Sequence, residues 1–230
     1  MAMSNKRVFQ LIDLDRTLFD TSRFIRLISD VVNQREPGLG NEIDARFEAM
    51  YQKEETFFVL EFLRQKLGKP RYDALVRDAL RDIDVSSLLL PGVQERLAFA
   101  ETLSETTPGY GILTYTLYPE DQALKVELVG LDHIPMYIGD TPDKAELISS
   151  WQNDDGTFQL PEEFGGQIVD ELTFEDDKLR AFIGLPEHTH GVWITHYDDA
   201  DERLAATGLT NVAAARGMEQ SIELLKTKFS

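Results

Sequence analysis

Two aspartates follow an apolar run of strand length near the start of the chain. The run "VFQLID" covers residues 8–13, and Asp13, Asp15 and Thr17 alternate along the segment "DLDRTL". Carboxylates at this spacing can bind a hard cation or take part in nucleophilic and acid–base chemistry. The same pair can also simply end a strand and begin a turn. A role in chemistry therefore depends on partners elsewhere in the chain.

Polar side chains that could be such partners follow three later apolar runs. Thr114 lies near the end of "YGILTY", Lys144 comes shortly after "IPMYIG", and Asp170 and Glu171 close "GQIVDE". In an open α/β sheet, ligands bind at the edge where the carboxyl ends of the parallel strands meet. The strand ends therefore offer carboxylates twice, a hydroxyl and an ammonium, all expected at one edge of a sheet.

The ammonium has two rivals in the sequence. Lys125 and Lys178 also lie near predicted strand ends, and exposed lysines are usually solvated. Lys144 is favoured because it lies at the start of a predicted helix, between the run that holds Thr114 and the run that ends in Asp170.

The later carboxylate also has an alternative. The segment "IGDTPD", residues 138–143, could supply it through Asp140, but this would leave the "IVDE" run without a role. The sequence therefore favours Asp170 as the later carboxylate, with Glu171 beside it. Asp176 and Asp177 follow closely, and whether either one assists a metal site is left open.

Five apolar runs predict the strands that position these side chains. They cover residues 8–13, 110–115, 134–139, 166–171 and 191–195. Continuous apolar runs suit strands that are buried on both faces, as in a parallel sheet. Helix-like stretches at 91–105, 143–151 and 176–184 lie between most of them. The alternation predicts an α/β fold with a doubly wound, mostly parallel five-stranded sheet and right-handed crossovers.

The region between the first strand and Pro91 breaks this alternation. Residues 20–88 contain no good strand and predict about four helices, the first of them "TSRFIRLISDVVNQ" at 21–34. Its apolar residues recur at helical spacing, and Thr21 or Ser22 can cap its start. A helical module inserted directly after the strand that carries the two aspartates would cover the ligand-binding edge of the sheet.

Composition excludes several classes of protein and site. The chain has 230 residues, no Cys and a formal net charge of −18. Without Cys, disulfides, thiolate metal sites and a cysteine nucleophile are excluded. The negative charge repels nucleic-acid phosphates, so nucleic-acid binding is not expected. No segment has the ~20 apolar residues of a membrane span or the form of a signal peptide, which leads us to expect a cytoplasmic protein without membrane contacts.

The ordered set of motifs resembles the haloacid dehalogenase-like (HAD) superfamily of hydrolases. "DLDRT" is similar to the first of its four motifs, Thr114 to the second, Lys144 to the third, and the Asp170–Glu171 pair to the fourth. The resemblance extends over essentially the whole chain. It implies a Rossmann-like HAD core at residues 1–19 and 89–230 and a helical cap at 20–88.

The resemblance also implies a role for each motif residue. Asp13 would be the nucleophile that forms an aspartyl-phosphate, and Asp15 would be the general acid and base. Carboxylates of Asp13 and Asp170, with the backbone carbonyl of Asp15, would hold Mg²⁺, and Glu171 or Asp176 would contact the waters of the metal. Thr17, Thr114 and Lys144 would bind the phosphoryl group, with Lys144 also offsetting the charge of Asp13.

One residue departs from the family pattern. Arg16 stands where Gly is frequent, and an ordinary backbone conformation is expected for it because a positive φ would strain an Arg. The activity that the resemblance implies is Mg²⁺-dependent hydrolysis of a small phosphorylated metabolite. A phosphomutase with the same residues, or an inactive member that acts as a binding or regulatory protein, are the alternatives. The oligomeric state is left open.

Overall fold

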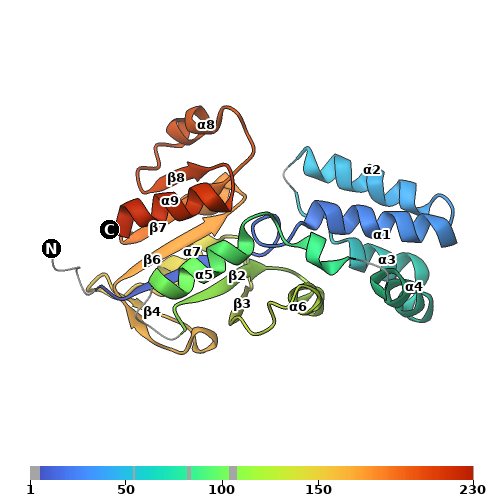
Figure 1. Ribbon diagram of the computed structural model, residues 1–230, viewed down its shortest axis with the longest axis horizontal. Coiled ribbons are helices and arrows are strands. Elements are labelled where there is room, and N and C mark those ends of the chain that lie inside the picture. The colour runs from blue at the N-terminus through green and yellow to red at the C-terminus, as the bar shows by residue number, and fades with distance from the viewer. Residues whose placement is uncertain (1–5, 54, 82–83, 104–107, 230) are drawn as a thin grey trace.

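A parallel β-sheet with helices on both faces forms one part of the molecule, and a group of helices forms the other (Figure 1). The computed structural model describes residues 6–53, 55–81, 84–103 and 108–229. The sheet has six strands in the order β3-β2-β1-β6-β7-β8, and all neighbouring pairs are parallel. The strands are β1 (Val8–Ile12), β2 (Tyr110–Tyr115), β3 (Met136–Gly139), β6 (Glu171–Asp176), β7 (Thr189–Ile194) and β8 (Val212–Ala215). The predicted doubly wound α/β fold is confirmed.

The fourth predicted strand was wrong in its position. Residues 166–171 do not form a strand of the large sheet, because Ile168 and Val169 form β5 (Ile168–Val169), which pairs with β4 (Phe158–Gln159) in a separate antiparallel sheet. The large sheet continues instead with β6, which ends at Asp176. The sixth strand, β8, was not predicted, since its sequence "VAAA" is short and only weakly apolar.

Helices cover both faces of the large sheet, and two separate apolar clusters mark the two faces. Val93 of α5 and Met218 of α9 pack with Ile12 of β1 in one cluster. Ile148 of α7 and Phe182 pack with the neighbouring side chain Leu11 in the other. The elements of this part are α5 (Val93–Leu103), α6 (Pro119–Leu128), α7 (Lys144–Ser150), η2 (Glu162–Phe164), η3 (Leu179–Phe182), α8 (Ala200–Thr207) and α9 (Met218–Phe229).

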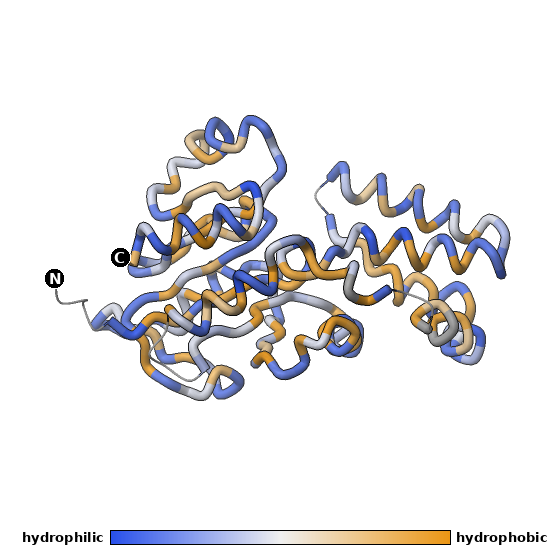
Figure 2. Tube along the Cα trace, viewed as in Figure 1, coloured by the Kyte–Doolittle hydropathy of each residue, from blue (hydrophilic) through white to orange (hydrophobic). Residues whose placement is uncertain are grey.

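The segment after β1 leads into the second part of the molecule, as predicted from the lack of strands there. Its elements are α1 (Thr21–Arg35), α2 (Leu39–Tyr51), α3 (Val59–Leu67), α4 (Lys69–Arg81) and η1 (Val85–Leu88). In Figure 2 each of these helices carries apolar residues along part of its length and hydrophilic residues along the rest. The assignment of residues 20–88 as a cap stays a prediction, and residues 54, 82 and 83 of this range lie outside the described residues.

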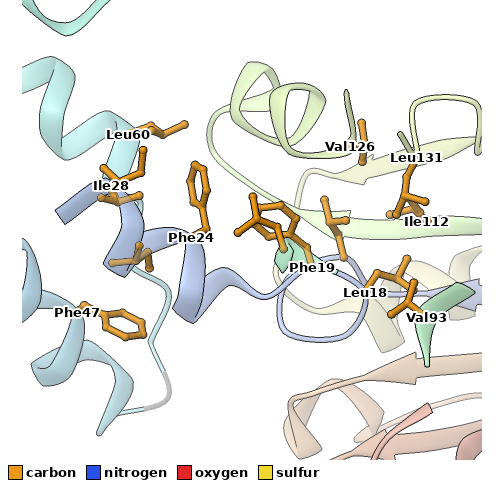
Figure 3. Close-up of a cluster of buried hydrophobic side chains, with 14 of the residues drawn as sticks. Leu18, Phe19, Phe24, Ile28, Phe47, Leu60, Val93, Ile112, Val126 and Leu131 are labelled. Atoms are coloured by element: carbon orange, nitrogen blue, oxygen red, sulfur yellow. The ribbon is translucent and has the colours of Figure 1, made fainter. Parts of the chain in front are cut away.

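The two parts share one continuous apolar cluster. Leu18 and Phe19, in the loop after β1, pack with Val93 and Ile112 on the sheet side, as Figure 3 shows. Phe19 also packs edge-on against Phe24 of α1, with ring centroids 5.4 Å apart. The cluster continues from there into α2 and α3. The helical part is therefore attached to the sheet by buried side chains as well as by its two connecting segments.

Within the described ranges, no helix combines the length and the apolar character that crossing a membrane requires.

Candidate active site

Asp13 lies directly after the central strand of the sheet. All five residues of β1 are buried between β2 and β6, which explains their apolar sequence. The register pairs Ile12 with Glu175, and the backbone N–H of Asp13 donates to the carbonyl oxygen of Glu175 at 2.9 Å. This hydrogen bond places Asp13 beside the residue that follows Glu175, which is Asp176.

Lys144 joins Asp13 and Asp176. It is the first residue of α7, where the side chain of Asp143 caps the helix by accepting from the backbone N–H of Glu146. The Lys144 ammonium donates to the carboxylate of Asp13 and, at 2.6 Å, to Oδ2 of Asp176. All three side chains are buried. Lys144 rather than its rivals thus contacts the first aspartate, as the sequence favoured.

Asp177 completes a group of three carboxylates. Oxygen atoms of Asp13, Asp176 and Asp177 all lie within 4.8 Å of one another. Three carboxylates carry three negative charges when ionised, against the positive charges of Lys144 and of Arg16, whose guanidinium lies 3.5 Å from Asp177. Negative charge remains in excess, which suits a cation, and Mg²⁺ prefers oxygen ligands such as these. The donor set and its charge therefore fit a bound Mg²⁺.

The crowding of these carboxylates shifts their proton affinities. Burial, opposed by Lys144 and reinforced by Asp176 and Asp177, raises the pKa of Asp13 to about 7. Burial and the charge of Asp176 raise the pKa of Asp177 to about 6. Burial would lower the pKa of Lys144, but its two carboxylate partners raise it above the ordinary range. Without a further cation, the ionised form of the cluster is thus destabilised near neutral pH.

Asp15 faces a different set of partners. Its carboxylate accepts hydrogen bonds from Oγ1 of Thr21 and Nζ of Lys125, both at 2.6 Å, and from Nε2 of Gln122 at 2.7 Å. Burial alone would raise the pKa of Asp15, but Lys125 and these hydrogen bonds hold it well below its usual range. Asp15 is therefore held ionised, and its partners come from α1 and α6.

The two predicted phosphate-binding threonines lie in β2 (Thr114) and in the loop between β1 and α1 (Thr17). Oγ1 of Thr114, in β2, accepts from the same Nε2 of Gln122 that contacts Asp15, at 2.9 Å. Thr17 is fully buried, and its Oγ1 has no hydrogen-bond partner among the described residues. Both hydroxyl protons are thus available to an acceptor.

The prediction that Arg16 has an ordinary backbone conformation was wrong. Its φ is +65°, in the left-handed region that favours glycine. The loop requires this value because it turns tightly, with the backbone N–H of Arg16 donating to the carbonyl oxygen of Phe19. The guanidinium lies 3.5 Å from Asp177 and over the ring of Tyr51 in α2.

The prediction that Asp170 and Glu171 lie at the metal site was wrong. Both residues lie at the amino end of β6, where the register pairs Glu171 with Val8 at the start of β1. Asp170 accepts from the side chain and backbone of Arg7, which lowers its pKa, and Glu171 contacts Lys6. The site is at the opposite end of these strands, so neither residue can contact a metal held by Asp13.

The place of Asp176 and Asp177 in this cluster did not follow from the sequence, because β6 is unusual. The strand "ELTFED" is buried throughout although it holds three acidic residues. One of them, Glu175, is fully buried in an ion pair with Arg96 of α5. The charged residues interrupt the apolar pattern of β6, so it does not read as a buried strand. The apolar pair "IV", which the sequence does show, belongs to β5.

Comparisons with known proteins identify the fold. Neither a protein-family model nor a curated protein sequence matches the chain. A solved structure described as a haloacid dehalogenase-like hydrolase, from Burkholderia xenovorans LB400, is similar with a TM-score of 0.61 and 16% identity. The match covers 95% of this chain and 98% of that one.

Two further solved structures share this architecture. One, described as a β-phosphoglucomutase from Thermotoga maritima, has a TM-score of 0.54 and 17% identity, over 96% of this chain and 99% of that one. The HAD-hydrolase YfnB from Bacillus subtilis, bound to magnesium, has a TM-score of 0.51 and 12% identity over the same shares. The chain therefore has the fold of the haloacid dehalogenase-like hydrolases, with helices inserted after the first strand of the sheet.

Proposed function

We propose that the protein is a Mg²⁺-dependent phosphohydrolase that cleaves small phosphomonoesters through an aspartyl-phosphate on Asp13. The observation that carries the proposal is the contact of Lys144 with both Asp13 and Asp176, in a cluster completed by Asp177. A nucleophilic carboxylate, a fixed ammonium and two further carboxylates are the groups that in-line phosphoryl transfer needs.

Asp13 and Lys144 would carry the first step. An oxygen of the Asp13 carboxylate attacks phosphorus, the bond from phosphorus to the ester oxygen breaks, and the leaving oxygen takes a proton from Asp15. Lys144 neutralises part of the negative charge on the transferred group, and the hydroxyls of Thr114 and Thr17 donate to its oxygens. Mg²⁺ held by Asp13, Asp176 and the backbone carbonyl of Asp15 would add positive charge at the phosphoryl oxygens.

Asp15 would carry the second step. A water molecule attacks phosphorus, gives its proton to the Asp15 carboxylate and releases phosphate from Asp13, which restores both side chains. The ionised form needed to accept this proton is the one that Lys125, Gln122 and Thr21 favour. The proton taken from water leaves Asp15 protonated, as it must be to serve as the acid of the next cycle.

Release of phosphate from a panel of phosphomonoesters, with Mg²⁺ and with a chelator, tests the proposal. Activity is expected only with Mg²⁺, and Asp13→Asn is expected to abolish it while leaving the circular dichroism spectrum unchanged. Asp170→Asn is the matched control and should retain activity, because Asp170 lies at the opposite end of the sheet. Turnover by Asp13→Asn at a rate near that of the wild type would contradict the covalent route.

A phosphomutase would use the same residues, and one solved structure with this fold is described as a β-phosphoglucomutase. The two activities differ in their products. A mutase returns the phosphoryl group to its substrate through a bisphosphate and releases no free phosphate, so steady release of phosphate without a bisphosphate supports the hydrolase.

A further inference from the structure

A cavity of about 590 Å³ opens beside the three carboxylates. Asp177 and Arg16 line it, so it shares a wall with the proposed metal site. Its other walls come from Tyr51 of α2 and from the segments around β7, η3 and α8. A second cavity, on the side of Asp15, has only about 40 Å³. Because ligand sites typically have 300–1,000 Å³, the larger cavity is the one that can hold the alcohol part of an ester.

Positive charge is concentrated around this cavity although the chain carries a net charge of −18. Two acidic residues line it, Asp20 and Asp177. The basic residues that line it are Arg16, Lys178, Arg180, Arg203 and Arg216. Basic residues thus outnumber acidic ones along the lining, although Arg16, Arg203 and Arg216 are each paired with a carboxylate.

Lys178 differs from Arg16, Arg203 and Arg216 in its partner. Arg203 is paired with Asp199 at 2.8 Å, and Arg216 with Asp198 at 3.4 Å. Nζ of Lys178 instead donates to the neutral hydroxyl of Thr56, at 3.1 Å. Among the residues that the structure describes, no carboxylate is in direct contact with this ammonium, and an anion in the cavity would be a stronger partner than a hydroxyl.

Lys178 is also fixed next to the carboxylate cluster. It follows Asp177, and its backbone N–H donates to Oδ1 of Asp176 at 2.8 Å. The side chain is half-buried and lines both cavities. One small molecule could therefore contact Lys178 with one group and place a phosphoryl group at Asp13 with another.

Aromatic side chains provide the apolar part of the cavity. Tyr51, Trp193 and Tyr197 line it, and Trp193 is buried with its Nε1 donating to the carbonyl oxygen of Asp177. Apolar walls with a few fixed charges are typical of sites that bind small organic molecules.

We propose that the substrate is a phosphomonoester whose alcohol part carries a second anionic group on an apolar body, and that Lys178 binds this anion. The inference rests on the proposed function, since it places the phosphoryl group at Asp13. The second anion replaces the Thr56 hydroxyl as the partner of Lys178, and the apolar body packs against Tyr51 and Trp193. Lys178 is thus a specificity-determining residue.

Two synthetic esters of nearly equal shape test this inference. They are 3-carboxyphenyl phosphate and 3-carbamoylphenyl phosphate, which differ in the charge of the distal group. The wild type is expected to cleave the carboxy ester with a kcat/KM about tenfold higher, mainly through a lower KM. Lys178→Met should remove this preference by weakening the carboxy ester alone, and Lys178→Arg should keep it.

Lys228→Met is the matched control for the loss of one positive charge. Lys228 is exposed near the end of α9 that lies away from Met218, which lines the cavity. The control should keep the wild-type preference. Equal kcat/KM values for the two esters in the wild type, or equal losses for both in Lys178→Met, would overturn the inference.

Failure of the proposed function would have a different signature. If neither ester releases phosphate, the hydrolase proposal fails. Calorimetric titration of the same esters into the wild type and Lys178→Met then tests whether Lys178 binds the distal anion in the cavity. Tighter binding of the carboxy ester by the wild type alone supports the anion site. Equal binding of the two esters overturns it.

Discussion

At the scale of single residues, the site is a cluster of carboxylates around one ammonium. Lys144 donates to Asp13 and Asp176, while Asp177 contacts Arg16 at a longer distance. Burial and mutual repulsion make the fully ionised cluster unfavourable. Buried carboxylates with shifted pKa values of this kind are typical of sites that bind a cation or a reacting group.

Replacing Asp13 is expected to stabilise the metal-free protein at high pH. The pKa of Asp13 is about 7 in the folded protein, against an ordinary value of 3.8 for an aspartate in an unfolded chain. The folded state therefore binds more protons than the unfolded state between these values, and stability falls as pH rises through this window. In chelator at pH 8, Asp13→Asn should have a melting temperature at least ~2 °C above the wild type, and the difference should shrink toward pH 5.

Asp170→Asn provides a control of opposite sign for that measurement. Hydrogen bonds from Arg7 lower the pKa of Asp170, so its ionised form contributes stability above its unfolded pKa. This variant should be slightly less stable than the wild type at pH 8. A melting temperature of Asp13→Asn below that of the wild type at pH 8 in chelator would contradict our description of the cluster.

The left-handed conformation of Arg16 gives a second prediction. A non-glycine residue at φ +65° carries a strain of about 1 kcal/mol that glycine avoids. Arg16→Gly and Arg16→Ala both remove the contacts with Asp177 and Tyr51, but only the glycine relieves the strain. Urea unfolding should find Arg16→Gly more stable than Arg16→Ala by about 1 kcal/mol. Equal stabilities would show that the backbone of the loop is not strained.

At the scale of elements, α6 is tied to the loop after β1 by an ion pair. Lys125 of α6 donates to Asp15, whose side chain also receives a hydrogen bond from Gln122 of the same helix. Both partners of the ion pair are largely buried. Losing the lysine leaves a buried carboxylate with fewer donors, which is costly.

Lys125→Met is therefore expected to destabilise the protein by roughly 2 kcal/mol at pH 7 in urea unfolding. Because Lys125 holds the pKa of Asp15 below its usual range, the loss should diminish as pH falls below about 4, where the unfolded state binds a proton. Lys228→Met, at an exposed position, should change stability by less than about 0.5 kcal/mol. A loss from Lys125→Met that does not depend on pH would contradict the ion pair.

The sequence predicted elements well where apolar periodicity was strong. The strands around Asp13 and Thr114 and the helix that begins at Lys144 follow from short-range patterns, and the structure places them as expected. Strand β6 did not follow, because the partner that neutralises Glu175 is Arg96, which is 79 positions away in the sequence. The conformation of Arg16 was likewise set by hydrogen bonds of the folded loop. Tertiary contacts of this kind are not visible in a local pattern.

At the scale of the whole molecule, the sheet order explains how distant segments form one site. Strand β1 lies between β2 and β6, so the residues after these three strands come to the same edge. The helices inserted after β1 share a buried cluster with the sheet and contribute Tyr51 to the cavity beside that edge. Both the carboxylate cluster and the wall of the cavity beside it therefore depend on the complete fold.

Calorimetric titration of Mg²⁺ into the wild type and three variants tests the central claim, which is that Asp13 and Asp176, with Asp177 beside them, form one metal site. The wild type should bind a single Mg²⁺, and Asp13→Asn and Asp176→Asn should each lower the affinity at least about tenfold, since each removes a charged ligand. Asp170→Asn should bind like the wild type. Loss of binding in Asp170→Asn together with unchanged binding in Asp176→Asn would contradict the account.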